Sequence, residues 1–222
     1  MKRHILFSFR RCPYAIRARW AIKACGLEVE LREVNLKNKP SEFLKNSSSK
    51  TVPLLILKNG VIIEESLEIV LWALQTSINQ YANKYYKKIS QNKINKIINE
   101  NDNIFKFHLD RFKYSSRFND NKKELHFLEC QKFIKSWNSL LNNSTNIWLI
   151  DNQESIADWC LWPFVRQFKI ACDSAGISNY FDEPLEIWFN YFAKHKYFQE
   201  VMYKYSFWEN SSLVETFPKN LD

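Results

Sequence analysis

Apolar positions follow two different patterns along the chain, and the change falls near residue 78. Before it, short β-like runs and helical stretches alternate in the order HILFSF, PYAIRARWAIKAC, EVELREV and a short helix around Lys39 to Asn46. The runs PLLIL and VIIE follow, separated by Lys58, Asn59 and Gly60, and Asn-Gly between apolar runs is a strong hairpin signal. A helical run from Ser66 to Gln75 closes this part. The order predicts an α/β domain over residues 1–78, with a mixed four-stranded sheet.

Beyond residue 78 the apolar spacing is helical throughout. Two amphipathic helices are predicted from Ile94, Ile97, Ile98, Ile104, Phe105, Leu109 and Phe112, and from Phe127, Leu128, Phe133, Ile134, Trp137 and Leu141. Ser155 and Asp158 have the spacing of a capping box, which would open a third helix. Pro184 suits the first turn of a fourth. Residues 79–222 are therefore predicted to form an all-helical bundle.

Composition places the chain among globular proteins and weakens two classes of partner. Its 222 residues are 45% hydrophobic and 16% aromatic, enough for one large core or two ordinary ones. The net charge is +8, but the lysines are scattered among asparagines, as in NKYYKKISQNKINK (83–96), which favours a solvated helix face over a nucleic-acid site. Neither a signal peptide nor an apolar run of transmembrane length is evident, so we expect a cytoplasmic protein that does not bind membranes.

The five cysteines include no CxxC pair, which suits neither a disulfide scaffold nor a zinc site. Free thiols in a reducing compartment are therefore expected, with no metal site. Cys25, Cys130, Cys160 and Cys172 lie on helical patterns among apolar neighbours, where cysteine usually acts as a small apolar side chain.

Cys12 stands in a different setting. Pro13 is tolerated in the first turn of a helix, so it places Cys12 at the helix N-terminus. Free amides, the positive end of the helix dipole and the nearby Arg10, Arg11 and Arg17 all favour a thiolate, which is the attacking form in disulfide exchange. Position 15, where a dithiol enzyme carries its second cysteine, is Ala15. The second thiol must therefore come from solution, with glutathione the obvious donor.

Four motifs in this order carry a resemblance to a known family: CPYAIRARWAIKACG, VNLKNKPSEFLKN, TVPLLIL and IEESLEI. Together they resemble the N-terminal thioredoxin-fold domain of cytosolic glutathione transferases, nearest to the omega class and its bacterial cysteine-type and glutaredoxin-like relatives. The resemblance covers nearly all of residues 1–78. In the second domain SIADWCLWPF (155–164) is similar to the family's capping box, and the rest matches only in helical character.

The resemblance gives each motif a role in binding glutathione. Cys12 would be the nucleophile that forms a mixed disulfide with glutathione. Pro53 would be a cis-proline that exposes the backbone N–H and C=O of Val52 to the cysteinyl part of glutathione, as an added strand does. Tyr14 replaces the phenylalanine usual in omega proteins and adds a hydroxyl to the ring.

The remaining glutathione contacts would come from three more residues. Glu65 and Ser66 would hold the γ-glutamyl end, because Ser66 opens a helix whose free amides receive a carboxylate and Glu65 can accept from the amino group. Lys39 would meet the glycyl carboxylate. The loop KNSSSKTVP departs from the family because it lacks the Asn-Pro and Gly often found before Val-Pro.

These roles imply a glutathione-dependent thiol transferase or reductase. Its acceptor, an electrophile, a disulfide or an oxidised compound, would bind between the domains. The resemblance also implies a homodimer, and conjugation to electrophiles should be weak because no early Tyr or Ser stands at the position used by other classes. The pocket would be lined by aromatic and polar side chains of the helical domain, namely Phe105, His108, Phe112, Tyr114 and Trp162.

Two alternatives stay open at this point. One is a noncatalytic protein-interaction module with the glutathione transferase fold, which the retained Cys12 and the Glu65-Ser66 pair argue against. The other is an intracellular chloride-channel-like relative, which shares a Cys-Pro start. Its membrane form needs an apolar helix that can insert, and the helix after Cys12 contains Arg17, Arg19 and Lys23.

Overall fold

The structure, a computed structural model, describes residues 3–77, 91–118, 121–144, 146–150, 153–210 and 212–219. The chain divides into two compact units, Met1–Lys87 with His195–Asp222, and Lys88–Lys194. This division differs from the predicted boundaries, 1–78 and 79–222, because residues 195–222 group with the first unit and not with the helical one. Of the segment 83–96, predicted to be a solvated helix face, residues 83–90 lie outside the described part of the chain.

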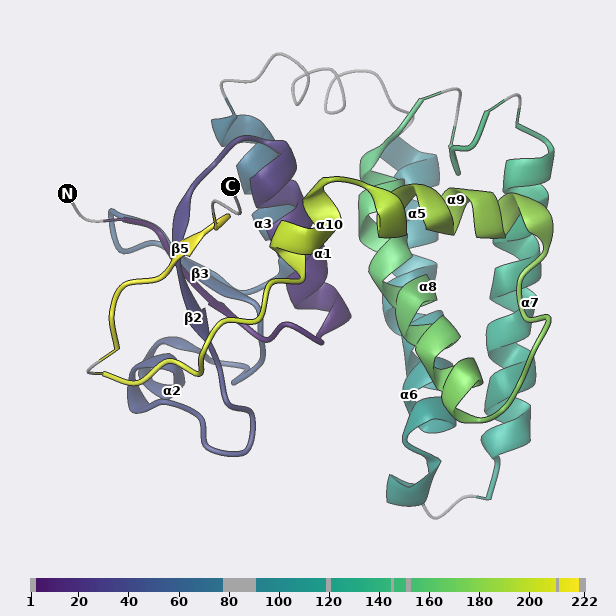
Figure 1. The fold of residues 1–222 in the computed structure, drawn as a ribbon, viewed down its shortest axis with the longest axis horizontal. Coiled ribbons are helices and arrows are strands. Elements are labelled where there is room, and N and C mark those ends of the chain that lie inside the picture. Colours follow the sequence, from purple (N-terminus) through teal and green to yellow (C-terminus); the bar gives the residue numbers. More distant parts are fainter. Residues whose placement is uncertain are drawn as a thin grey trace. The chain divides into compact units, whose positions relative to one another are not determined.

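The first unit is built on a mixed sheet of five strands in the order β4-β3-β1-β2-β5. The strands are β1 (Ile5–Ser8), β2 (Val29–Glu33), β3 (Leu54–Ile56), β4 (Ile62–Ile63) and β5 (Thr216–Phe217). β1 and β2 are parallel, and the other neighbouring pairs are antiparallel. The predicted α/β domain with a mixed sheet is confirmed, with one strand more than expected. That strand, β5, pairs with β2 and comes from the C-terminal segment (Figure 1).

Helices of the first unit pack beside this sheet. They are α1 (Pro13–Ala24), α2 (Ser41–Asn46), α3 (Ser66–Thr76) and α10 (Tyr197–Val201). Pro13 is the first residue of α1, and Gly26 follows the helix with a φ of 67°, a conformation that glycine adopts without a steric penalty. α1 contacts both α3 and α10, so the C-terminal segment lies against the helix that begins after Cys12 (Figure 1).

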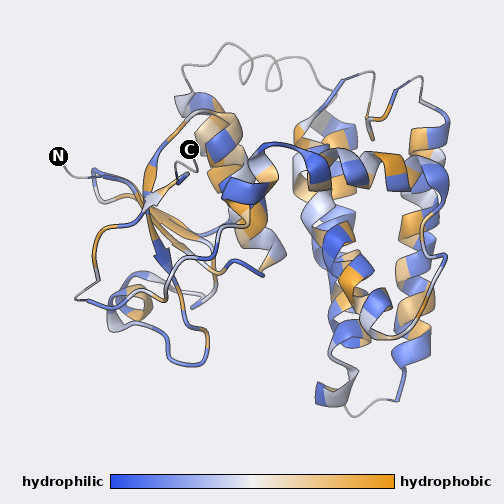
Figure 2. Ribbon diagram, in the orientation of Figure 1, coloured by the Kyte–Doolittle hydropathy of each residue, from blue (hydrophilic) through white to orange (hydrophobic). Residues whose placement is uncertain are grey.

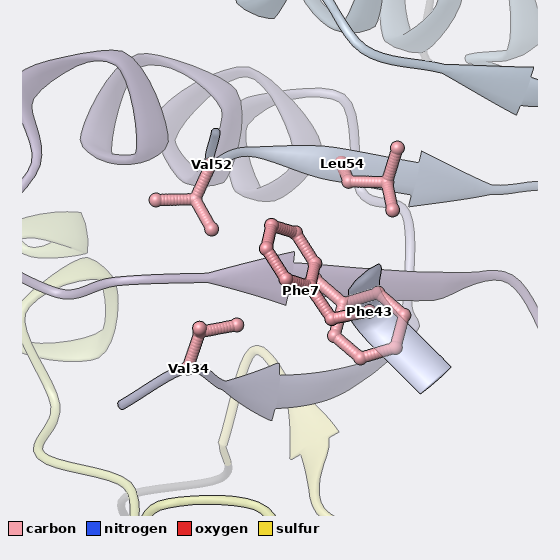
Figure 3. Packing of buried hydrophobic residues seen from close by; sticks show 5 residues of the cluster. All are labelled: Phe7, Val34, Phe43, Val52 and Leu54. Carbon is pink, nitrogen blue, oxygen red and sulfur yellow. The ribbon is translucent and has the colours of Figure 1, made fainter. Parts of the chain in front are cut away.

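A cluster of five buried side chains holds the sheet to α2 and to the loop before β3. It consists of Phe7, Val34, Phe43, Val52 and Leu54, which Figure 3 shows gathered across the strands. Full burial of an aromatic or aliphatic side chain contributes about 1.5–3 kcal/mol. Cys12 packs against the edge of this cluster. One core therefore supports both the predicted nucleophile and Val52.

The second unit is helical in its described residues, as predicted. Its elements are α5 (Gln91–Glu100), the π-helical turn η1 (Asn101–Phe105), α6 (Lys106–Lys113), the 3-10 turn η2 (Ser115–Arg117), α7 (Lys123–Asn142), α8 (Ile156–Ser174) and α9 (Glu183–Lys194). Figure 2 shows hydrophobic and hydrophilic residues alternating along α7 and α8. The π turn is wider than an α turn and shifts the register after it, and Ile104, predicted on the apolar face, is 46% exposed. In the described part of the chain no helix is long and apolar enough to cross a membrane.

The capping box of α8 is confirmed and has a larger role than a cap. Asp158, which is fully buried, accepts from the backbone N–H of Ser155 at 2.8 Å and of Leu149 at 3.0 Å. It also accepts from the indole N–H of Trp188 on α9 at 2.9 Å. One carboxylate thus joins the start of α8 to the preceding loop and to α9.

Replacing Asp158 with alanine should lower the free energy of unfolding by about 3 kcal/mol or more, because several buried donors would lose their acceptor at once. Urea denaturation measures this change. The control is Asp173→Ala, which removes a carboxylate that is 50% exposed and paired with Lys169, where a loss under about 1 kcal/mol is expected. Equal losses in the two variants would show that the buried contacts of Asp158 do not carry this stability.

Candidate functional site

Cys12 lies in a tight turn between β1 and α1. Its backbone N–H donates to the Phe9 carbonyl at 2.9 Å, and its own carbonyl accepts from Ile16 at 2.9 Å. Cys12 is thus the N-cap residue of α1, with Pro13 following it, as the sequence predicts. The side chain is half-buried, so the thiol is held by the fold and still reaches solvent.

The thiol of Cys12 lies beside the Val52–Pro53 peptide. Sγ of Cys12 is 3.6 Å from the Val52 carbonyl oxygen, to which the protonated thiol donates. The Val52–Pro53 bond is cis, as the resemblance implies. Because the Val52 side chain is buried in the core cluster, its backbone is left to face Cys12 (Figure 3). The structure therefore brings the predicted nucleophile and the predicted backbone-binding residue together.

Ser66 marks a second part of the site, at the start of α3. Its side chain is 3% exposed, and its hydroxyl accepts from the Arg17 guanidinium at 3.2 Å. Arg17 is fully buried and lies 5.4 Å from the centre of the Tyr14 ring. Glu65, the N-cap residue of α3, is exposed. A buried cation therefore lies directly behind the residue predicted to receive a carboxylate, which favours an anion there.

From the sequence, Arg17 is expected only to add positive field at Cys12. Its contact with Ser66 joins residues 49 positions apart in the chain. A signal was available, since Arg17 stands among apolar residues on the inner part of α1. A charged side chain in such a position requires a polar partner.

Lys39 and Glu64 hold the loop before Val52. The Lys39 ammonium donates to the Lys50 carbonyl at 2.9 Å. The Glu64 carboxylate accepts from the backbone N–H and the hydroxyl of Ser48 at 2.5 and 2.6 Å, and these hydrogen bonds lower the pKa of Glu64. Glu64 lies in the IEESLEI motif next to Glu65 but is not among the residues expected from the sequence to act in the site. Its contacts and that of Lys39 hold the loop that departs from the family in lacking Asn-Pro.

The other four cysteines are buried, as predicted. Burial raises the pKa of Cys25 to about 12 and that of Cys172 to about 12, and it also raises the pKa of Cys130. Such thiols hold almost no thiolate at neutral pH. Partial exposure therefore distinguishes Cys12 from the other cysteines.

Three of the five residues predicted to line an acceptor pocket are core residues of the helical unit. Phe105 packs against Trp137 with ring centres 4.8 Å apart, and Phe112 packs against Phe127 at 5.2 Å. Trp162 stacks on Phe192 at 5.7 Å. All three predicted residues are at most 2% exposed, so their side chains fill the core and do not line an open surface.

The other two predicted pocket residues have partners within the helical unit. Nδ1 of His108 lies 2.9 Å from Nδ1 of His126 on α7, and the Tyr114 ring lies 4.3 Å from the Arg117 guanidinium. The helical unit also contains a cavity of about 520 Å³ between α5, α7 and residues 143–150, lined in part by Lys96 and Trp148. In the described part of the chain, none of the five predicted residues is among its lining residues.

A family model matches the part of the chain that contains Cys12 and Val52. The family described as Glutathione S-transferase, N-terminal domain, matches residues 6–79. Glutathione S-transferase omega-1 of Rattus norvegicus is 39% identical over 62 residues, which are 28% of this chain and 26% of the relative. The chain thus matches about a quarter of that relative's length.

Solved structures extend the likeness to the fold of the whole chain. A glutathione transferase family member from Pseudomonas fluorescens pf-5, solved with two glutathione bound, has a TM-score of 0.74 and 15% identity, and the match covers 90% of this chain and 92% of that one. Glutathione transferase Omega 3C from Trametes versicolor has a TM-score of 0.68 and 16% identity over 88% of this chain and 82% of its own. The likeness in fold therefore includes the helical unit as well as residues 6–79.

Alkylation of the native protein with limiting iodoacetamide should modify Cys12 about tenfold or more faster than any other cysteine, because the others are buried. Peptide mapping by mass spectrometry assigns the sites. Cys12→Ser should abolish the fast phase, and Cys25→Ala should leave it unchanged. Fast labelling of a buried cysteine in the folded protein would contradict the assignment.

Acid should weaken the His108–His126 contact. Two Nδ1 atoms can share a hydrogen bond only when one ring is neutral, and burial together with nearby His126 lowers the pKa of His108 below 6.5. The stability from this neutral ring is present above pH 6.5 and is lost as the pH falls below it. Between pH 7 and 5 the wild type should therefore lose more free energy of unfolding than His108→Leu, measured with urea at each pH. Parallel pH curves for the two proteins would contradict this.

Proposed function

We propose that the chain is a glutathione-dependent thiol transferase or reductase that works through Cys12. The observation that carries the proposal is the position of the half-buried Cys12 thiol, at the N-terminus of α1 and 3.6 Å from the Val52 carbonyl. The helix N-terminus favours a thiolate, and Val52 precedes the cis-proline, where its backbone would pair with an extended peptide. A structural neighbour was solved with glutathione bound, which supports glutathione as the co-substrate.

The proposed reaction has two disulfide exchanges. The Cys12 thiolate attacks the glutathione sulfur of a glutathionylated substrate, the old S–S bond breaks, and the substrate leaves as a thiolate. Cys12 is then joined to glutathione in a mixed disulfide. The thiolate of a second glutathione attacks the glutathione sulfur of this mixed disulfide. The bond to Cys12 breaks, glutathione disulfide is released, and the Cys12 thiolate is regenerated. Ala15, where a second cysteine would stand, makes the external thiol necessary.

Binding would use the contacts that surround Cys12. When Cys12 enters the mixed disulfide its S–H is gone, so the Val52 carbonyl becomes available to accept the cysteinyl N–H of glutathione. The γ-glutamyl carboxylate would meet Ser66, with the buried Arg17 guanidinium behind it and Glu65 receiving the amino group. Lys39 would exchange its bond to the Lys50 carbonyl for the glycyl carboxylate.

The five cysteines form no disulfide among the described residues, which suits a reducing compartment such as the cytoplasm. A homodimer is proposed by analogy with the family. The acceptor class is a disulfide, an oxidised compound or a small electrophile.

Cys12→Ser should reduce glutathione-dependent reduction of a mixed disulfide, such as cysteine joined to glutathione, by about a hundredfold or more, because serine forms no disulfide. Activity is followed by coupling glutathione disulfide formation to its reductase. The Cys25→Ala variant should keep wild-type activity. Full activity of Cys12→Ser would overturn the mechanism. A wild-type protein that shows no heat of glutathione binding by calorimetry would instead favour the noncatalytic interaction module.

A further inference from the structure

Glu33 is a buried carboxylate that contacts the turn carrying Cys12. It ends β2, and its side chain is 4% exposed. Oε1 accepts from the backbone N–H of Arg10 at 2.6 Å, two residues before Cys12. Oε2 forms an ion pair with the Arg19 guanidinium on α1. One carboxylate therefore links the turn before α1 to the helix itself.

Arg19 also donates to groups on β1 and α10. Its guanidinium is fully buried and donates to the Ser8 hydroxyl at 2.9 Å, at the end of β1. It also donates to the Val201 carbonyl at 3.1 Å, at the end of α10. Burial raises the pKa of Glu33, and Arg19 and the Arg10 amide oppose that rise by stabilising the carboxylate. The charges of Arg19 and Glu33 thus compensate each other within the core.

The C-terminal segment also contacts the backbone of Glu33 and the side chain of Arg10. The Trp208 N–H donates to the Glu33 carbonyl at 2.8 Å, and the Arg10 guanidinium reaches the Met202 carbonyl at 3.4 Å. The Trp208 ring lies 4.2 Å from the Arg32 guanidinium and packs edge-on against Phe7. The C-terminal segment thus contacts the backbone of Glu33 through Trp208 and the side chain of its partner Arg19 through the Val201 carbonyl.

We infer that Glu33 is a positioning residue for Cys12, acting through the Arg10 amide and the Arg19 ion pair. This inference rests on the proposed function of Cys12. The turn from Phe9 to Cys12 is closed by one backbone hydrogen bond of 2.9 Å, so the Arg10 amide is a main point at which the body of the domain can fix it. A charged acceptor at 2.6 Å holds an amide more firmly than a neutral one. The orientation of the turn then sets where Sγ stands relative to Val52.

The ion pair also protects the charge of the thiolate. A bare carboxylate near Cys12 would disfavour ionisation, but Arg19 neutralises Glu33 within the core. The positive field of the helix N-terminus is therefore preserved while the turn is held by an anion. Loss of the Glu33 charge should misplace the thiol and leave Arg19 without its counter-ion, and both changes act on Cys12 reactivity and not only on stability.

The test compares Glu33→Gln with Glu30→Gln. Glu30 lies on the same strand and pairs with Arg32 at 2.7 Å, so it matches Glu33 in residue type and strand. In folded Glu33→Gln, the iodoacetamide rate at Cys12 should fall about tenfold at pH 7 and its pH profile should shift. In the disulfide assay kcat should fall about tenfold while KM for glutathione stays within about twofold. Glu30→Gln should stay within about twofold of the wild type in all of these.

An unchanged alkylation profile and kcat in folded Glu33→Gln would overturn the inference. If that variant does not fold, Arg19→Lys is the second variant, because it keeps the charge and loses the forked contacts with Glu33, Ser8 and Val201. It should slow Cys12 alkylation several-fold, and a wild-type rate would overturn the inference. Alkylation needs neither glutathione nor substrate. A wild-type protein without transferase activity would therefore refute the proposed function and leave the positioning role to be judged by alkylation alone.

Discussion

The buried ion pair between Arg19 and Glu33 is the constraint on which the first unit depends. Taking two charges out of water costs several kcal/mol per ion, so the pair is stable only because further polar groups complete its coordination. Ser8, the Arg10 amide and the Val201 carbonyl supply them. Breaking such a pair by removing one partner costs about 3–5 kcal/mol. The end of β1, the turn before Cys12, α1 and the C-terminal segment must therefore adopt their positions together.

The site is selected by exposure as much as by charge. A packed core removes Cys25, Cys130, Cys160 and Cys172 from solvent, whereas Cys12 stands at the edge of the cluster around Phe7. The same cluster buries the Val52 side chain and so turns its backbone toward the thiol. Apolar packing thus determines both which sulfur can react and which backbone group faces it.

Features with a local cause could be predicted from the sequence. Pro13 determines where α1 begins, Asn59-Gly60 marks the turn between β3 and β4, and Ser155 with Asp158 opens α8. The pairing of β5 with β2 has no local cause, because it joins residues about 190 positions apart in the chain. The aromatic residues expected to line a pocket show a second limit of prediction from the sequence. Helical periodicity places Phe105 and Phe112 on an inner face but does not distinguish a core from a ligand pocket.

The surroundings of Glu33 could be predicted from the sequence only in part. Alternation along β2 puts it on the same face as the buried Val29 and Leu31, so the pattern alone implied a buried carboxylate in need of a cation. Arg19, in the middle of an otherwise apolar helix face, carried the matching signal. The contribution of the backbone of residues 201–208 could not be predicted from the sequence. Every residue carries the same carbonyl group, so the sequence does not show which carbonyl will accept from Arg19 or Arg10.

The return of the C-terminal segment to the first unit has a consequence for how the protein is made. During synthesis the domain that contains Cys12 leaves the ribosome first, yet β5 and the carbonyl groups of Val201 and Met202 follow only after the whole helical unit has been translated. Until then β2 lacks β5 as its neighbour and Arg19 lacks the Val201 carbonyl as an acceptor. The first unit is thus translated first but completes its fold last. Cys12 reaches its final surroundings only after the C-terminal segment has packed against β2 and α1.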